Sequence, residues 1–127
     1  MTTVLLVEDS LTETELLTQY LRQAGLSVVS VMNCDEARLK LQAQMPDLVL
    51  LDVILPGQSG FELCRELKTS TGTENIPVVI CSTKGTDADQ LWGTMLGADA
   101  YLPKPVDKQE LTKTVLQLTS SDWSSRL

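Results

Sequence analysis

Acidic side chains follow short apolar runs at two separate points of the chain. Glu8 and Asp9 come after the run at residues 4–7, and Asp52 comes after the run at residues 48–51. Three carboxylates brought together would repel one another and raise their own pKa values unless a cation shared the site. Mg²⁺ suits such a site, because it prefers oxygen ligands and typically takes one or two carboxylates together with a phosphate oxygen.

A hydroxyl pair and a lysine occur at comparable places later in the chain. Ser82 and Thr83 follow the fourth apolar run, and Lys104 follows the fifth. Beside an acidic metal site these groups would stabilise a phosphoryl group, Lys104 as a point charge and Ser82 as a hydrogen-bond donor. Asp52 would then be the nucleophile, because a carboxylate can accept a phosphoryl group as an aspartyl phosphate.

The elements that must position these residues alternate regularly along the chain. Apolar runs of strand length are separated by amphipathic segments of helix length. We expect strands at 4–7, 27–31, 48–51, 76–81 and 100–102, and helices at 11–24, 34–44, 59–69, 86–97 and 107–119. Unbroken Val, Leu and Ile runs are typical of a parallel sheet buried on both faces. The sequence therefore predicts an α/β fold with a five-stranded parallel sheet, whose carboxyl edge gathers the side chains named above.

Three expected helices begin with a capping side chain three residues before a glutamate. In this pattern the two side chains accept hydrogen bonds from backbone amides that have no partner within the first turn of the helix. These pairs are Ser10 with Glu13, Asn33 with Glu36, and Asp107 with Glu110. Gly25 and Gly97 follow the first and fourth helices, where a left-handed backbone favours a residue without a Cβ. The helix boundaries are thus indicated independently of the apolar pattern.

The length of 127 residues indicates a single domain. We expect this domain to span residues 1–119 and residues 120–127 to form a short C-terminal tail, with no output domain. The chain shows no secretion signal and no apolar run of the ~18 residues that a membrane helix needs. We therefore expect a cytoplasmic protein without membrane insertion.

The composition argues against several classes of function. A formal charge of -7 argues against unspecific binding to nucleic acid or to anionic membranes, which needs a basic face. The chain has no histidine, and its cysteines form no C-x-x-C motif, which argues against a zinc site. Cys34, Cys64 and Cys81 are interpreted as reduced thiols.

Taken in order, these motifs resemble the response-regulator receiver family, and in particular its CheY-like single-domain members. The resemblance rests on the acidic pair after the first strand, on D-x-x-x-P-x-x-x-G from Asp52 to Gly60, on Ser-Thr after the fourth strand and on Lys-Pro after the fifth. It covers residues 3–119. It implies a flavodoxin-like (βα)5 doubly wound fold with the strand order 2-1-3-4-5.

The resemblance also implies which residues hold Mg²⁺. Asp9 and Asp52 would be direct ligands, the backbone carbonyl of Ile54 would be a third, and Glu8 would act mainly through a water molecule. The metal would serve Asp52, the acceptor of the phosphoryl group.

Three further residues have roles implied by the family. Lys104 would contact the phosphoryl oxygens, and the Lys104–Pro105 peptide would be cis. Ser82 would move toward the phosphoryl group, and Tyr101 would then turn inward. This switch would reshape the face made by the fourth helix, the fifth strand and the fifth helix.

The function implied is that of a single-domain response regulator in a two-component phosphorelay. Its partners would be a histidine kinase or phosphotransfer protein and a downstream protein target, for example in chemotaxis or motility, but not nucleic acid. The chain would be a monomer or a phosphorylation-dependent dimer, and would catalyse only its own phosphorylation and dephosphorylation. An intermediate phosphate carrier in a relay is equally compatible.

Each residue also has a simpler interpretation when it is taken alone. Glu8 and Asp9 are compatible with an ordinary charged helix start, Asp52 with a loop cap and Lys104 with a surface lysine. Ser82 and Thr83 could merely end a strand, and Tyr101 could be a core aromatic residue. The roles of Trp92 and Trp123 stay open between packing and partner binding.

Two alternative functions belong to other classes. One is a receiver-like interaction module that works without phosphate. The other is a haloacid-dehalogenase-type, Mg²⁺-dependent phosphatase, whose D-x-D motif would need a second acid at the position of Ile54. The absence of that acid argues against the phosphatase.

Overall fold

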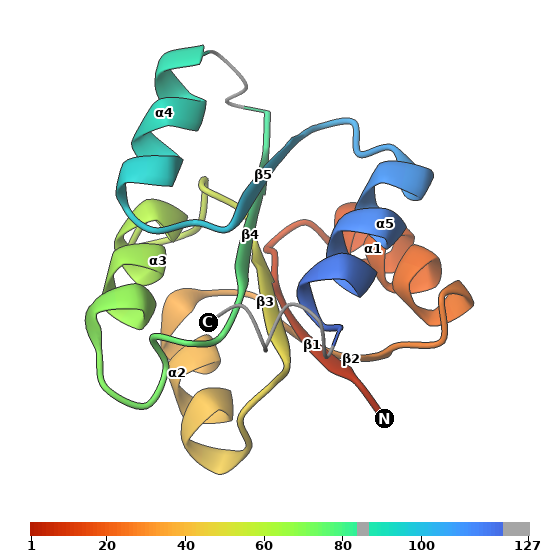
Figure 1. Ribbon diagram of the computed structural model, residues 1–127, viewed down its shortest axis with the longest axis horizontal. Helices are drawn as coiled ribbons and strands as arrows, with labels where there is room; N and C mark the ends of the chain where they lie inside the picture. Colours follow the sequence, from red (N-terminus) through yellow and green to blue (C-terminus); the bar gives the residue numbers. More distant parts are fainter. Residues whose placement is uncertain (84–86, 121–127) are drawn as a thin grey trace.

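The alternating strands and helices form one parallel sheet in the computed structural model of the chain, which describes residues 1–83 and 87–120 (Figure 1). The strands are β1 (Thr3–Val7), β2 (Ser27–Val31), β3 (Leu48–Leu51), β4 (Val78–Ser82) and β5 (Ala100–Pro103). The helices are α1 (Leu11–Gln23), α2 (Cys34–Ala43), α3 (Gly60–Thr69), α4 (Asp87–Met95) and α5 (Lys108–Leu118). The strand order is β2-β1-β3-β4-β5, with every pair parallel, which confirms the predicted topology.

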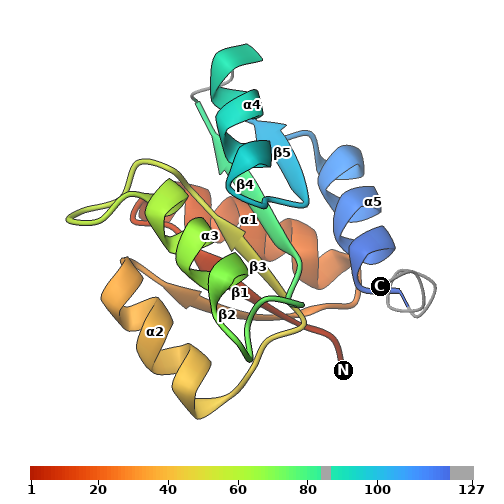
Figure 2. The same cartoon turned by 60° about the vertical axis from the view of Figure 1, so that its left-hand side comes forward.

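Helices cover both faces of the sheet. Figures 1 and 2 show α1 and α5 on one face and α2, α3 and α4 on the other. Alternate strand residues serve the two layers, since in β1 the side chains of Val4 and Leu6 pack in the first layer and those of Leu5 and Val7 in the second. Unbroken apolar strands are thus explained by burial on both sides.

The predicted helix starts are confirmed. The side chains of Ser10, Asn33 and Asp107 accept hydrogen bonds from the amides of Glu13, Glu36 and Glu110. A fourth start of the same kind was not predicted, although Ser59 and Glu62 have the same spacing. Gly25 and Gly97 have φ angles of 86° and 95°, as expected for left-handed helix ends.

The predicted bounds of the fourth strand were wrong. The strand begins at Val78 and not at residue 76, because the amide of Ile76 donates to the carbonyl of Thr73 in a turn, at 3.0 Å. Pro77 has no amide hydrogen with which to extend the ladder. The predicted bounds of the second and third strands are confirmed, and the remaining bounds differ from the observed ones by at most two residues, as helix and strand ends commonly do.

Parts of the sequence prediction concern residues that the structure does not describe. Residue 86, expected to begin the fourth helix, and residues 121–127 of the predicted tail, with Trp123, lie outside the described residues. Within residues 1–83 and 87–120, no helix has both the length and the apolar character required to cross a membrane.

Candidate functional site

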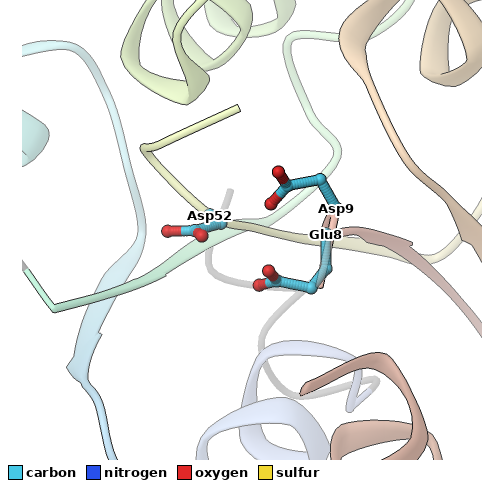
Figure 3. A group of neighbouring side chains, drawn as sticks. All are labelled: Glu8, Asp9 and Asp52. Carbon is cyan, nitrogen blue, oxygen red and sulfur yellow. The ribbon is translucent and has the colours of Figure 1, made fainter. Parts of the chain in front are cut away.

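The carboxyl edge of the sheet brings three carboxylates together. Glu8 and Asp9 follow β1, Asp52 follows β3, and these two strands are neighbours with Val7 paired to Leu51. Figure 3 shows the three side chains gathered at the ends of the two strands, and one oxygen of each lies within 4.8 Å of the others. Glu8 and Asp52 are buried while Asp9 is exposed. The predicted convergence of the acids is confirmed.

Lys104 lies inside this acidic cluster. Its Nζ is 2.7 Å from Glu8 Oε2 and 3.3 Å from Asp52 Oδ2, and only 8% of its side chain is exposed. The backbone following β5 places it there, because the Lys104 amide donates to the Ser82 carbonyl at 3.0 Å. The sequence predicted Lys104 at this edge, but no sequence signal indicated its ion pair with Glu8, which lies 96 residues away.

The charges of this pair depend on burial and on each other. Burial raises the pKa of Glu8, and the hydrogen bond from Lys104 opposes that rise. For Lys104, burial by itself would lower the pKa, but the hydrogen bond to Glu8 and the charges of Asp52 and Glu8 together raise it. Lys104 is therefore a charged ammonium group at neutral pH, and it offsets the repulsion among the carboxylates.

The backbone around Asp52 holds this residue in place. Its amide donates to the Val7 carbonyl at 3.1 Å, and its Oδ1 accepts from the Ile54 amide at 3.4 Å. Gly60 closes the loop by donating its amide to the Val53 carbonyl at 2.9 Å. A Cβ on Gly60 would overlap the carbonyl oxygen of Asp52, so this position of the motif requires glycine for space.

Ser82 and Tyr101 lie next to the acidic cluster. Ser82 is completely buried at the end of β4, whereas Tyr101 in β5 is half-buried. Burial raises the pKa of Tyr101, and its side-chain hydrogen bond with Ser82 opposes this rise. The Lys104–Pro105 peptide is cis, as expected. Ser82 therefore connects the lysine, through its backbone, with the tyrosine, through its side chain.

The donor set fits a hard divalent cation. The three side chains offer carboxylate oxygens only, they lie close enough to share one ion, and exposed Asp9 gives access from solvent. Oxygen ligands of this kind suit Mg²⁺ better than a softer metal. The fit supports a metal site at the place where the sequence predicts one.

The family model described as "Response regulator receiver domain" matches residues 4–116 of the chain. The chain belongs to the response-regulator receiver family. Receivers act as signalling switches in two-component systems, and the sheet order and acidic cluster found above are those of this family.

Individual relatives agree with this assignment. The receiver is 39% identical to protein PilH of Pseudomonas aeruginosa over 91% of this chain and 95% of PilH. It is 38% identical to the phosphate regulon transcriptional regulatory protein PhoB of Rhizobium meliloti over 88% of this chain, but spans only 49% of PhoB. Among solved structures, the chain is similar to the receiver domain of the sensor histidine kinase PA1611 from P. aeruginosa, which contains a magnesium ion coordinated in its active-site cleft. The two structures superpose with a TM-score of 0.85 at 25% sequence identity, and the match covers 94% of this chain and 98% of that domain.

Proposed function

We propose that this receiver is a single-domain response regulator of a two-component phosphorelay and that Asp52 is its phosphoacceptor. The observation that carries the proposal is the position of Asp52, buried at the end of β3, 3.3 Å from the Lys104 ammonium and beside Glu8 and Asp9. An acid so placed combines a nucleophile, a cationic neighbour and a set of metal ligands in one small volume.

The chemistry is a phosphoryl transfer from a histidine kinase, a phosphotransfer protein or a small phosphodonor. A carboxylate oxygen of Asp52 attacks phosphorus, and the bond from phosphorus to the donor breaks with its electron pair leaving on the donor. Lys104 keeps an ammonium group next to the oxygens of the transferred phosphoryl group and stabilises their negative charge. Asp9, Asp52, the Ile54 carbonyl and, through water, Glu8 would hold Mg²⁺, which supplies further positive charge at those oxygens.

The switch begins at Ser82. Its hydroxyl turns toward the new phosphoryl oxygens, and Tyr101, its present hydrogen-bond partner, turns inward. This rearrangement changes the face formed by α4, β5 and α5. Leu91, Trp92 and Met95 of α4 are exposed, so this helix offers apolar surface to a protein target. Trp92 is then a partner-binding residue.

The same proposal covers the setting of the protein. The domain spans residues 1–119 with a short tail at 120–127, works in the cytoplasm, and signals to a downstream protein, for example of a chemotaxis or motility apparatus. The match with PilH over nearly its whole length supports a signalling role that rests on the receiver itself. The chain is a monomer or a dimer formed on phosphorylation, and it catalyses only the gain and loss of its own phosphoryl group.

Intact-mass spectrometry after treatment with acetyl phosphate and Mg²⁺ tests the proposal. The wild-type chain should gain one phosphoryl group, and the gain should disappear in Asp52→Asn and without the metal. Asp107→Asn is the matched control, because asparagine still caps α5 and this aspartate lies outside the acidic cluster.

The opposite results would reject the proposal. Folded wild-type protein that gains no phosphoryl group, from acetyl phosphate or from a histidine kinase, would be a phosphate-independent interaction module. An adduct that persists in Asp52→Asn would place the acceptor on another residue.

A further inference from the structure

Arg38 of α2 connects three separate segments of the receiver. Its Nε and Nη2 donate to the two carboxylate oxygens of Glu66 in α3, at 2.8 and 3.0 Å. Its Nη1 donates to Asp35 at 3.0 Å, and its Nη2 also donates to the side-chain oxygen of Gln58 in the β3–α3 loop. The planar guanidinium can make these bonds at the same time because its donors point in fixed directions.

The β3–α3 loop that Arg38 reaches is part of the Asp52 site. Its residues 53–59 follow Asp52 and include Ile54, whose amide donates to the Asp52 side chain. Val53 is buried in the core and Leu55 packs against it, whereas Ile54, Pro56 and Gly57 are exposed, and Gly57 has a φ of 79°. Apolar burial therefore fixes the first part of the loop, and residues 56–58 depend more on polar contacts.

The far side of the loop is fixed from α2. Cys34 and Arg38 lie one turn apart on this helix, and the Cys34 thiol donates to the Gln58 carbonyl at 3.4 Å. Among the residues that the structure describes, these two supply the side-chain hydrogen bonds that reach the loop from another element. The thiol is a weak donor, so the charged Arg38 is the stronger restraint.

We propose that Arg38 is a positioning residue of the phosphorylation site. By holding Gln58 against α2 and α3, it fixes the loop on which Ile54 presents its backbone to Asp52. This role rests on the proposed function for its metal and phosphoryl consequences, whereas the restraint on the loop can be measured without either.

The sign of the effect separates positioning from simple electrostatics. Arg38 is a cation in the same domain as a cation-binding site, so removing its charge alone should strengthen Mg²⁺ binding slightly or leave it unchanged. Loss of the loop restraint should instead weaken Mg²⁺ binding, because the Ile54 carbonyl is no longer held. The two explanations therefore predict opposite changes.

The test compares Arg38→Met, Arg38→Lys and Gln58→Ala with Arg65→Met as the matched control. Arg65 is an exposed arginine on α3, and none of the contacts described here involves its side chain. Arg38→Lys keeps the charge but loses the planar fork. The double variant Arg38→Met with Gln58→Ala asks whether the effect of Arg38 passes through Gln58.

Two measurements are made on each variant. Hydrogen exchange of the metal-free chain should be faster by about tenfold in residues 54–60 of Arg38→Met, with β1 unchanged. The Mg²⁺ concentration that half-saturates phosphorylation by acetyl phosphate should rise about tenfold, the lower end of the range for residues that support a metal ligand, while the rate at saturating Mg²⁺ stays within about twofold. Arg38→Lys and Gln58→Ala should behave in the same way, and the double variant should be no worse than Arg38→Met.

Other outcomes would overturn the inference. A lower thermal stability of Arg38→Met with an unchanged Mg²⁺ requirement would show that Arg38 only joins α2 to α3. Tighter Mg²⁺ binding in Arg38→Met would show a purely electrostatic effect. If wild-type protein takes no phosphate, the proposed function fails by itself, and unchanged loop exchange in the metal-free variants would reject the positioning role separately.

Discussion

At the scale of single residues, Lys104 is a counterion for the acidic site. Buried carboxylates are costly unless they are paired, and the Lys104 ammonium lies within 3.3 Å of two of them. A divalent cation that enters the cluster would be repelled by this ammonium group. The acidic cluster is thus partly neutralised by the protein itself.

Replacing this counterion should change both stability and metal affinity. In Lys104→Gln the free energy of unfolding without divalent ions should fall by about 3 kcal/mol, because two buried carboxylates lose their partner. Mg²⁺ should bind more tightly than in wild type, because the competing ammonium is gone. Urea unfolding with and without Mg²⁺ measures both effects, and Lys113→Gln, on the exposed face of α5, is the control. Equal stabilisation of all three proteins by Mg²⁺ would contradict the competition.

The sequence predicted the acidic residues of the site but not the partners that hold them. Glu8 and Asp52 are recognisable because each stands where an apolar run stops. Lys104 pairs with Glu8 across 96 residues, and Arg38 reaches Gln58 across 20. Such long-range pairs depend on where the folded chain places each side chain. Neither the spacing of residues nor the composition of the sequence predicts them.

At the scale of elements, one aspartate joins α3 to the start of β4. Asp99, just before β5, accepts hydrogen bonds at Oδ2 from Lys68 Nζ at 3.1 Å and from the Val78 amide at 2.8 Å. Lys68 also donates to the Ile76 carbonyl at 3.1 Å. A side chain on Gly97 would come within 3.0 Å of Lys68, so the segment before β5 packs directly on α3.

Two substitutions of Asp99 should differ in a predictable way. Asp99→Asn keeps an oxygen for the Val78 amide and removes only the ion pair, so the expected loss is about 1 kcal/mol of the free energy of unfolding. Asp99→Ala also leaves a buried amide without a partner, which should cost about 1–2 kcal/mol more. Equal losses in denaturant unfolding would show that the Val78 amide finds another partner. Lys68→Met should cost more than Asp99→Asn, because it removes both the ion pair and the hydrogen bond to the Ile76 carbonyl.

Local signals predicted the elements well where the chemistry is local. Ser10 and Asn33 cap their helices as the spacing to the next glutamate indicates. The predicted start of β4 was wrong, because the apolar character of Ile76 and Pro77 does not reveal that the backbone is still in a turn. The periodicity of apolar residues indicates which side chains are buried, whereas the end of a strand is set by its backbone hydrogen bonds.

At the scale of the whole molecule, the interior holds three free thiols. Cys34, Cys64 and Cys81 are all buried. Burial raises the pKa of Cys64 to about 11 and that of Cys81 to about 12, and it also raises the pKa of Cys34. The thiols are therefore protonated and inert in the folded protein at neutral pH.

These thiols should make stability fall at alkaline pH. The unfolded chain loses thiol protons near pH 9, whereas the folded chain keeps those of Cys64 and Cys81 until about pH 11 and 12. Between these values the folded state binds more protons, so the free energy of unfolding declines as pH rises. Urea unfolding from pH 8 to 11 measures the decline, which should be shallower in Cys81→Ala. A parallel pH profile for wild type and Cys81→Ala would contradict this account.

The global arrangement was only partly accessible from the residues themselves. Alternation of strands and helices predicts a parallel sheet, but doubly wound sheets occur with more than one strand order. The order 2-1-3-4-5 came from the resemblance to receivers and is confirmed by the pairing of β1 with both β2 and β3. Long-range packing determines which strands become neighbours. The strand order therefore cannot be predicted from the local patterns of a single sequence.

The central place of β1 has a consequence for synthesis on the ribosome. This strand leaves the exit tunnel first, yet it is flanked by β2 and by β3, so it gains its second neighbour only when residue 51 has emerged. Glu8, Asp9 and Asp52 can meet at that stage. Lys104 follows half a chain later and takes its place only after β5 has paired with β4. The three carboxylates of a nascent receiver thus leave the ribosome before their counterion, and divalent ions can offset their repulsion in the interval.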